Sequence, residues 1–415
     1  MQIRIENLFG HMPPAMLPRV FQASMAQAGT CQQCPQSCLP KSGCPKAQGT
    51  QRMKSLLLAS LLGLSLAPAT ASAAAAPAGG HAEPGGFAIE KLAEGIYAAV
   101  RTDPPGLMVD ANSLFIVNDA DVVVVDAPEA SAEMIAALRK ITGKPVTYLV
   151  NTHWHDDHVI GNAAWRKAYP GIRFIGHASL RDYLPTTGAK NREGMIKGAP
   201  EFAGQMQAQM DKGRNLQDQP ISDEERASYA SDIRLVKRYM EVVPGTAAVL
   251  PDIDVNEGLT LVRGERRIEV RHLGSGHTLA DLVVWLPKER IVATGDLVVW
   301  PIPLVGSDQS HVRDWPGTLD AVIALQPAML VPGHGPVERN TDYARQMRDL
   351  FASINQQVAA AVARRASLED TRKAVDLAAF RDRFAGESKV RRFAFGMYVV
   401  GPAVESAWRD ATVKP

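Results

Sequence analysis

Apolar residues in the first half of the globular region fall in short blocks that predict strands separated by turns and helices. Residues 89–100 and 113–118 predict strands with turns between them. Residues 121–126 enclose four consecutive valines, and such a continuous apolar run indicates a strand buried on both faces. Residues 130–142 carry apolar side chains at helical spacing, and residues 146–150 predict the next strand.

The alternation of strands and helices continues through the second half of the chain. Residues 173–176 predict a strand, and residues 192–241 a long helical segment in which Ser222 and Glu225 have the spacing of a capping box. Further strands are expected at 259–263, 267–272, 282–286 and 290–294, and helices at about 316–325 and 342–365, followed by a mainly helical tail with Ser367 as a cap. Two runs of strands with interspersed helices predict a layered α/β sandwich.

A different pattern precedes this region and predicts export. Met53, Lys54 and Ser55 form a short basic opening, residues 56–66 are apolar, and residues 69–73 are small. This is the layout of a secretory signal peptide, and the run is shorter than the roughly 20 apolar residues of a membrane span. We therefore expect a periplasmic or secreted protein with no stable membrane span after signal removal. An uncleaved anchor or a buried helix is the alternative.

Residues 1–52 do not fit a chain that begins with a signal peptide at Met53. The simplest interpretation is an over-extended start, with translation beginning at Met53. The alternative is a small metal or iron–sulfur site, because the chain's four cysteines lie close together here, at Cys31, Cys34, Cys38 and Cys44. Residues 74–86, rich in alanine, proline and glycine, predict a linker. The mature fold would then contain no disulfide.

Composition narrows the function further. The 415 residues are 46% hydrophobic, which is ordinary for a globular protein with a real core. The 45 basic and 44 acidic residues leave a net charge of +1. Because nucleic-acid-binding domains normally carry a basic excess, this balance predicts that nucleic acid is not a partner.

The densest group of chemically active residues directly follows the predicted strand at 146–150. It places three imidazoles and one metal-binding carboxylate within six positions, at His153, His155, Asp157 and His158. On a loop that ends a strand, His153 and His155 can point to the same side. Zinc and similar metals favour imidazole and carboxylate ligands, so this motif predicts a metal site rather than an incidental polar loop.

Three later motifs add weaker signals of the same kind. They are Gly274-Ser-Gly-His277-Thr278, Ala293-Thr-Gly-Asp296-Leu297 directly after the strand at 290–294, and Val331-Pro-Gly-His334-Gly335. A histidine between glycines is more often a turn residue than a ligand. The order of the motifs and the glycines next to their histidines and aspartate make the combination a specific signal of a metal site.

The four motifs THWHDDH, GSGHT, ATGDL and VPGHG resemble, in this order, the metal-binding motifs of the metallo-β-lactamase fold superfamily of metal-dependent hydrolases. The resemblance covers residues 87–340. It implies a four-layer αββα sandwich, with the helical insert at 192–241 and a helical C-terminal extension at 341–415. A small-molecule substrate is the partner it implies.

The resemblance also implies which residues hold two metal ions. His153, His155 and His277 would bind the first metal, Asp157, His158 and His334 the second, and Asp296 would bridge them. Asp126 matches an acid that braces the ligand loops without binding metal. Two Zn²⁺ ions are expected, with iron or manganese as alternatives.

The number of predicted ligands indicates hydrolysis independently of the known activities of the superfamily. Three histidines leave a zinc ion with an open position, as catalytic zinc requires. A hydroxide shared by two metals would attack a carbonyl carbon, and Asp157 would orient it or relay a proton. No G-x-S-x-G motif for a serine nucleophile is present in the sequence.

Several residues near the motifs have two interpretations each. Thr152, Thr278 and Asp281 would either fix the imidazoles or simply cap their loops. Trp154 and Trp300 would line the substrate pocket or, more commonly for such residues, pack in the core. The histidines outside the motifs, His177, His272 and His311, are interpreted as structural or surface residues.

The substrate is less well defined by the sequence. The stretch around His277 and Asp296 resembles zinc β-lactamases that have cysteine at the position of Asp296 and, three residues later, a carboxylate-binding lysine where this chain has Val299. Asp296 instead resembles the glyoxalase II-like branch. Small esters, lactones, thioesters and amides are therefore the expected substrates, with β-lactams as one candidate class.

Two other functions stay open: an iron-dependent redox enzyme on the same fold, and a non-catalytic metal-binding module. His155 stands where the oxygen-reducing branch typically has glutamate, which disfavours the first. The full ligand set disfavours the second. The insert would be a lid with an apolar methionine face (Met195, Met206, Met210 and Met240) or an outer packing helix. The tail would cover the sheet or mediate dimer contacts, and the oligomeric state is not predicted.

Overall fold

The computed structural model describes residues 86–305, 308 and 310–412. The predicted start, the cysteine cluster, the signal peptide and nearly all of the linker lie outside these residues. Within them, no helix has both the length and the apolar character needed to cross a lipid bilayer.

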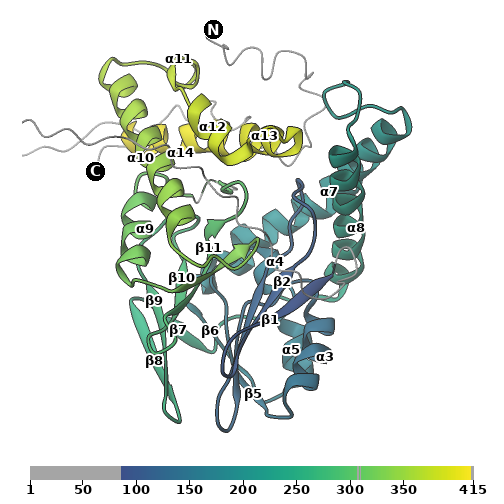
Figure 1. The fold of residues 1–415 in the computed structure, drawn as a ribbon, viewed down its shortest axis with the longest axis vertical. Coiled ribbons are helices and arrows are strands. Elements are labelled where there is room, and N and C mark those ends of the chain that lie inside the picture. Colours follow the sequence, from purple (N-terminus) through teal and green to yellow (C-terminus); the bar gives the residue numbers. More distant parts are fainter. Residues whose placement is uncertain (1–85, 306–307, 309, 413–415) are drawn as a thin grey trace, which may run out of the picture. The chain divides into compact units, whose positions relative to one another are not determined.

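Two β-sheets form the centre of the fold (Figure 1). The first contains seven strands in sequence order: β1 (Phe87–Ala93), β2 (Ile96–Arg101), β3 (Ser113–Val117), β4 (Val122–Val125), β5 (Val146–Val150), β6 (Arg173–His177) and β7 (Ile253–Val255). The second has the order β12 (Met329–His334), β11 (Ile291–Val299), β10 (Leu282–Leu286), β9 (Arg266–His272) and β8 (Gly258–Arg263). Strands β4 to β7 are parallel, as are β11 and β12.

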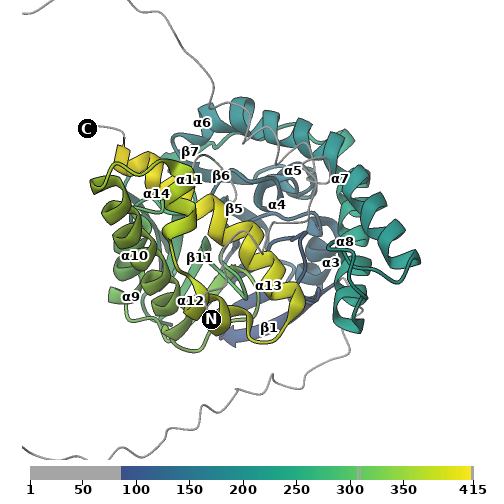
Figure 2. The ribbon, with the colours of Figure 1, turned by 90° about the horizontal axis from the view of Figure 1, so that it is seen from above.

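Helices cover the outer faces of both sheets. Figures 1 and 2 show α3 (Ser131–Ile141) and α5 (Asn162–Ala168) beside the first sheet, and α9 (Trp315–Ala324) and α10 (Asp342–Ala363) beside the second. The valines of β4 show how the layers are joined. Val123 and Val125 pack in the core between the sheets, while Val122 and Val124 pack in the core that includes α3. The predicted αββα sandwich and the two-sided burial of this strand are confirmed.

The insert lies between β6 and β7 of the first sheet and consists of two long helices. It contains α7 (Ala189–Asp211) and α8 (Asp223–Val242), preceded by α6 (Leu180–Tyr183) and a π-helical turn at Leu184–Gly188. Asn215 orders the loop between them, because its Oδ1 accepts hydrogen bonds from the N–H groups of Gln217 and Gln219. The predicted capping box of Ser222 and Glu225 is present at the start of α8.

The methionines of the insert are packing residues rather than an exposed apolar face. Met206 and Met210 are buried in the large core on the outer side of the second sheet. Met195 and Met240 are partly buried against Tyr239. The lid role of the insert stays a prediction.

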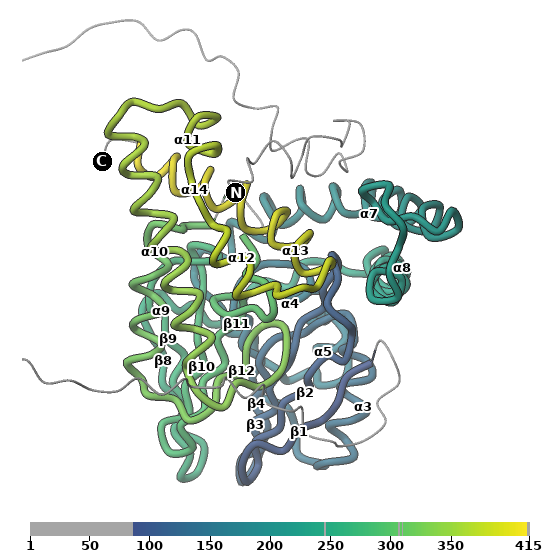
Figure 3. The backbone as a smooth tube through the Cα atoms, turned by 45° about the horizontal axis from the view of Figure 1, so that its top comes forward, coloured from purple at the N-terminus to yellow at the C-terminus, as the bar shows by residue number. Residues whose placement is uncertain are grey.

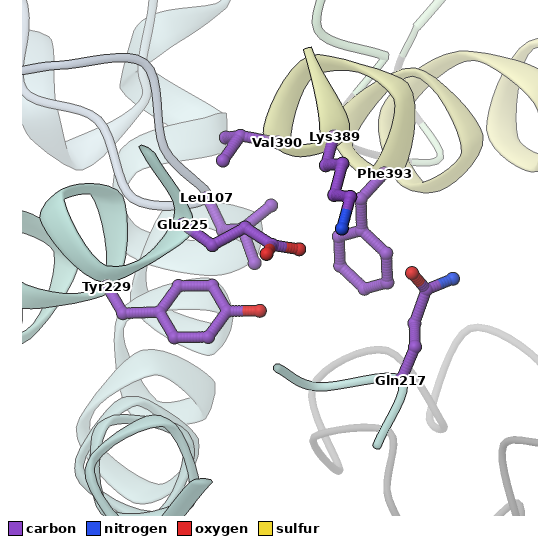
Figure 4. A pocket seen from close by; sticks show the side chains of 7 residues that line it. All are labelled: Leu107, Gln217, Glu225, Tyr229, Lys389, Val390 and Phe393. Carbon is purple, nitrogen blue, oxygen red and sulfur yellow. The ribbon is translucent and has the colours of Figure 1, made fainter. Parts of the chain in front are cut away.

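The C-terminal extension continues from α10 through four more helices. They are α11 (Leu368–Ala374), α12 (Ala378–Ala385), α13 (Lys389–Phe395) and α14 (Gly401–Thr412), with a π-helical turn at Gly396–Val400. Ser367 caps α11 as predicted. In Figures 1 and 3, α12 and α13 cross over the strand ends on the side where α4 (Asp156–Val159) lies. Helix α13 meets α8 beside Leu107 (Figure 4).

Three strands differ from the prediction, and the short strand β7 is one that was not predicted. Strand β11 does not end at residue 294 but runs to Val299, so Asp296 lies within it. Gly295, with φ of 50°, produces irregular pairing that lets the strand continue past a residue pattern resembling a turn. Strand β12 was not predicted, because Pro332 and Gly333 interrupt its apolar pattern.

The loop between β2 and β3 is held by a buried carboxylate from the insert. Both oxygens of Asp232 accept backbone hydrogen bonds, from Leu107 N at 2.9 Å and Met108 N at 3.0 Å. The Tyr398 hydroxyl of the C-terminal extension donates to Leu107 O. A Cβ at Gly106 would lie 2.2 Å from Asp232 Oδ1, so the close approach requires glycine. Insert and extension together fix this loop.

The pKa of Asp232 predicts a pH-dependent contribution to stability. Burial raises this pKa to about 7, against the two backbone hydrogen bonds that lower it. Between the unfolded pKa of 3.8 and about 7, the folded state holds a proton that the unfolded state has released, so stability falls as pH rises. Between pH 5 and pH 8, we expect the free energy of unfolding of the wild type to fall by about 2–3 kcal/mol relative to that of Asp232→Asn.

Urea unfolding of metal-loaded protein at several pH values measures this difference. Asp254→Asn, which alters an exposed ion pair with Arg181, is the control and should show no such trend. A pH-independent difference between wild type and Asp232→Asn would contradict the prediction.

Candidate metal centre

The structure brings all seven predicted ligands together at one edge of the two sheets. His153 and His155 follow β5, and Asp157 and His158 lie in the short helix α4. His277 lies in the loop between β9 and β10, Asp296 in β11, and His334 at the end of β12. Their ligand atoms form two groups, within each of which all atoms lie within 4.8 Å of one another. The groups are His153, His155, His277 and Asp296, and Asp157, His158 and His334.

The carboxylate of Asp296 faces both groups with different oxygens. Its Oδ2 lies 3.4 Å from His277 Nε2 and 4.0 Å from His153 Nε2. Its Oδ1 lies 3.1 Å from His158 Nε2 and 3.3 Å from His334 Nε2. A carboxylate with one oxygen toward each group has the arrangement needed to bridge two cations.

The spacing of these atoms fits metal ligation. Donors at two corners of a tetrahedron around zinc are about 3.3 Å apart, given zinc–nitrogen bonds of about 2.0–2.1 Å. In the second group, Asp157 Oδ2 lies 3.2 Å from His334 Nε2 and 3.5 Å from His158 Nε2. In the first group, His155 Nδ1 and His277 Nε2 are closer, at 2.8 Å.

Buried atoms without hydrogen-bond partners provide a second test of the fit. Such atoms are costly unless something else satisfies them. Six of the seven residues contribute one: His153 Nε2, His155 Nε2, Asp157 Oδ2, His158 Nε2, Asp296 Oδ1 and His334 Nε2. Five of these six atoms belong to the converging ligand set. The exception is His155 Nε2, because His155 faces His277 through Nδ1. The residues therefore fit a pair of metal ions.

The electrostatics of the two groups differ. In the first, burial lowers the pKa of His153 well below its usual value and that of His155 to about 3, so these imidazoles are neutral and ready to bind a cation. In the second, burial also favours the neutral ring, but nearby carboxylates, with Asp296 first, raise the pKa of His158 and bring that of His334 to about 10.

Asp126 holds the first motif in place, as the sequence predicted. Its Oδ1 accepts a hydrogen bond from Thr152 N at 2.8 Å, and its Oδ2 contacts Thr152 Oγ1 at 2.9 Å and His158 Nδ1 at 2.8 Å. Thr152 Oγ1 also lies 3.1 Å from His153 Nδ1. The carboxylate therefore orients His158 so that Nε2 faces the centre. Asp126 has φ of 60°, a left-handed conformation that aspartate tolerates better than most residues.

Backbone carbonyls orient two further imidazoles. His277 Nδ1 lies 2.9 Å from Leu304 O, and His334 Nδ1 lies 3.1 Å from Asp110 O. Sequence reasoning missed both, because every residue has a carbonyl and no motif marks the ones that contact a ligand. Asp110 is itself buried, and its side chain accepts the N–H of Glu129 at 3.0 Å.

Thr278 and Asp281 contact each other rather than the imidazoles. Asp281 accepts hydrogen bonds from Thr278 N and Thr278 Oγ1, the latter at 2.6 Å. They thereby close the loop that carries His277, and Asp281 O contacts His272 Nδ1 at 2.9 Å.

The two tryptophans occupy different surroundings. Trp154 is 1% exposed and packs in a small core cluster with Leu180, its ring stacked on Tyr183. Trp300 is partly buried, and its backbone N–H donates to His334 O at 3.1 Å. The three histidines outside the motifs lie apart from the ligand groups; His177 and His272 contact each other.

Two glycines make this close packing of strands feasible. A Cβ at Gly333 would lie 1.9 Å from Asp296 Oδ1, and one at Gly295 would lie 2.4 Å from Thr152 Oγ1. Any larger residue would push the bridging carboxylate or the brace of the first motif out of position.

Comparison with known proteins agrees with this centre. Residues 108–334, more than half of the chain, match the family model of the metallo-beta-lactamase superfamily. The chain belongs to this superfamily, whose members are in general metal-dependent hydrolases.

Individual relatives are distant. A metallo-beta-lactamase type 2 of Bacteroides fragilis is 23% identical over 55% of this chain and 70% of its own length. A linear primary-alkylsulfatase of Pseudomonas sp. (strain ATCC 19151) is 23% identical over 57% of this chain, but only 44% of its own length is matched. A solved metallo-beta-lactamase from Pontibacter korlensis aligns with a TM-score of 0.45 and 17% identity, covering 64% of this chain and 99% of that one.

The brace at Asp126 can be tested without removing a metal ligand. We expect Asp126→Ala to lower zinc affinity by about 10–100-fold, because His158 and the Thr152 loop lose their fixed orientation. Competition with a chromophoric chelator measures the affinity. Asp254→Ala, which removes an exposed acid, should leave it unchanged. Equal affinity of Asp126→Ala and wild type would contradict the assigned role.

Proposed function

We propose that this protein is an exported dinuclear zinc hydrolase that cleaves a small ester, lactone, thioester or amide, with β-lactams as one class within that range. The observation that carries the proposal is the carboxylate of Asp296, which directs one oxygen to each of two ligand groups. His153, His155 and His277 would hold one metal, and Asp157, His158 and His334 the other.

The donor set favours zinc. It consists of imidazole nitrogens and carboxylate oxygens without thiolates, and zinc binds such sets with four or five ligands. When bound, divalent metals at such a centre lower the pKa of water and polarise a carbonyl oxygen.

The residues of the chain then have defined tasks. Asp126 and Thr152 keep the first motif rigid, so that the ligands need no rearrangement during the reaction. Asp157 Oδ2 lies within the second group, where its carboxylate orients the attacking water and takes its proton. Hydrolysis adds this water to the acyl carbon, the bond to the leaving oxygen, sulfur or nitrogen breaks, and the proton passes to the leaving atom.

The relatives support a hydrolase without choosing its substrate. They are named as a β-lactamase and an alkylsulfatase, two hydrolases with different substrates. Asp296 and Val299 replace the cysteine and lysine of the β-lactamases that the sequence most resembles, which favours the broader range of acyl substrates.

Substitution of the ligands tests the proposal directly. We expect His155→Ala to abolish hydrolysis and lower zinc content, and Asp296→Ala to lose one zinc more readily than both, because three other ligands remain in each group. Metal analysis and a panel of nitrocefin, lactone and thioester substrates, applied to the same samples, measure both effects.

His311→Ala is the control, since the half-buried His311 side chain belongs to neither ligand group and its backbone hydrogen bond to Gly276 O is kept in the variant. It should retain two zinc ions and full turnover. Wild-type turnover by His155→Ala, or a wild type that holds two metals but hydrolyses nothing on the panel, would refute the function.

Export has its own test. The basic opening at Met53, the apolar run at 56–66 and the small residues at 69–73 support cleavage after Ala73. We expect mass spectrometry of protein from the periplasm or medium to give an amino terminus near Ala74. Leu61→Arg, which interrupts the apolar run, should retain the protein in the cytoplasm. Full-length protein in the cytoplasm of cells expressing the wild type would contradict export.

A further inference from the structure

Arg391 on α13 lies over the ring of Trp300, the residue that follows strand β11. Its guanidinium carbon lies 4.9 Å from the ring centroid of Trp300. Its Nε is buried without a hydrogen-bond partner, and its guanidinium forms no ion pair within 4.0 Å with any residue that the structure describes. The neighbouring Arg392, in contrast, pairs with Glu387 and Asp382.

Trp300 connects this cation to the ligand layer. Trp300 follows β11, the strand that carries Asp296, and its backbone N–H donates to His334 O at 3.1 Å. Its ring lies against the next residue, because a Cβ at Gly335 would be 3.2 Å from Trp300 Cε3. One aromatic side chain therefore separates the guanidinium from the backbone that holds His334.

A cation at this place has a physical consequence for what the site binds. The Nε of this guanidinium is buried without a partner, and carboxylates are the groups that arginine pairs with most strongly, often through two hydrogen bonds. The aromatic ring beneath it stabilises the cation and keeps its planar fork in one orientation. The guanidinium is thus available to an anion that the described residues do not supply.

We propose that Arg391 is a specificity-determining residue that binds a carboxylate of the substrate while the scissile carbonyl lies at the metal centre. This inference rests on the proposed hydrolase function and narrows its substrates to carboxylate-bearing acyl compounds. Arg391 comes from the C-terminal extension, beyond the region that matches the family model.

A matched pair of ligands tests the assignment without turnover. Glutarate and butyrate each offer one carboxylate to the metals, but only glutarate has a second one for Arg391. By calorimetry with the zinc-loaded protein, we expect glutarate to bind about 10–100-fold more tightly than butyrate, as one charge-assisted hydrogen-bond pair would give. In Arg391→Gln this margin should fall to about twofold or less.

Lys389→Gln is the matched control. It removes one positive charge from the same helix, but Lys389 is exposed and lines the pocket between α8 and α13 rather than the Trp300 ring (Figure 4). It should keep the full margin. A wild type without a margin, a margin retained in Arg391→Gln, or an equal loss in Lys389→Gln would each overturn the assignment.

Kinetics separate this inference from the proposed function. With 4-nitrophenyl butyrate and mono-4-nitrophenyl glutarate, the ratio of kcat/KM values should favour the glutarate ester, and Arg391→Gln should lower that ratio by at least about tenfold. Hydrolysis of both esters with an unchanged ratio refutes the carboxylate site alone. Failure of the wild type to hydrolyse any substrate, with an Arg391-dependent glutarate margin, refutes the hydrolase alone.

Discussion

The burial of Asp296 between two groups of imidazoles is the constraint on which the rest of the structure depends. A carboxylate 3% exposed is costly unless positive charge surrounds it. Although burial favours the neutral rings of His158 and His334, nearby carboxylates, with Asp296 first, raise the pKa values of both imidazoles and so favour positive charge there. Two metal ions would supply it more completely and would also satisfy the buried nitrogens that lack partners.

This constraint explains the arrangement of the strands. Ligands that lie far apart in the chain meet only because β5, β11 and β12 end at the same edge, in sheets packed face to face through the valine-rich core. The imidazoles then need fixed orientations, and the braces come from other segments: Asp126 after β4, Leu304 after β11, and Asp110 in the loop after β2. That last loop is itself held by Asp232 and Tyr398. The geometry of the centre therefore also depends on contacts from the insert and the C-terminal extension.

The sequence predicted those parts of the centre that depend on patterns within a short stretch of the chain. The spacing of His153, His155 and Asp157 is a property of one short loop, and the four valines of β4 indicate burial on both faces. The role of Asp126 was expected only from the resemblance to the superfamily, in which an acid at the end of this strand braces the ligand loops. The extent of β11 was missed because Gly295 resembles a turn, and β12 because Pro332 and Gly333 interrupt its pattern. In both cases, pairing with a neighbouring strand outweighs local preference.

Contacts between distant segments could not be predicted in the same way. The carbonyls of Leu304 and Asp110 carry no side-chain signal, and nothing in the sequence around Arg391 indicates that α13 passes beside Trp300. The centre itself does not select one substrate, because relatives named for different substrates share the superfamily. Selectivity must therefore arise from groups around it. In this chain those groups include a helix outside the shared region, and a guanidinium that no described acid pairs with favours anionic acyl compounds over neutral ones of the same shape.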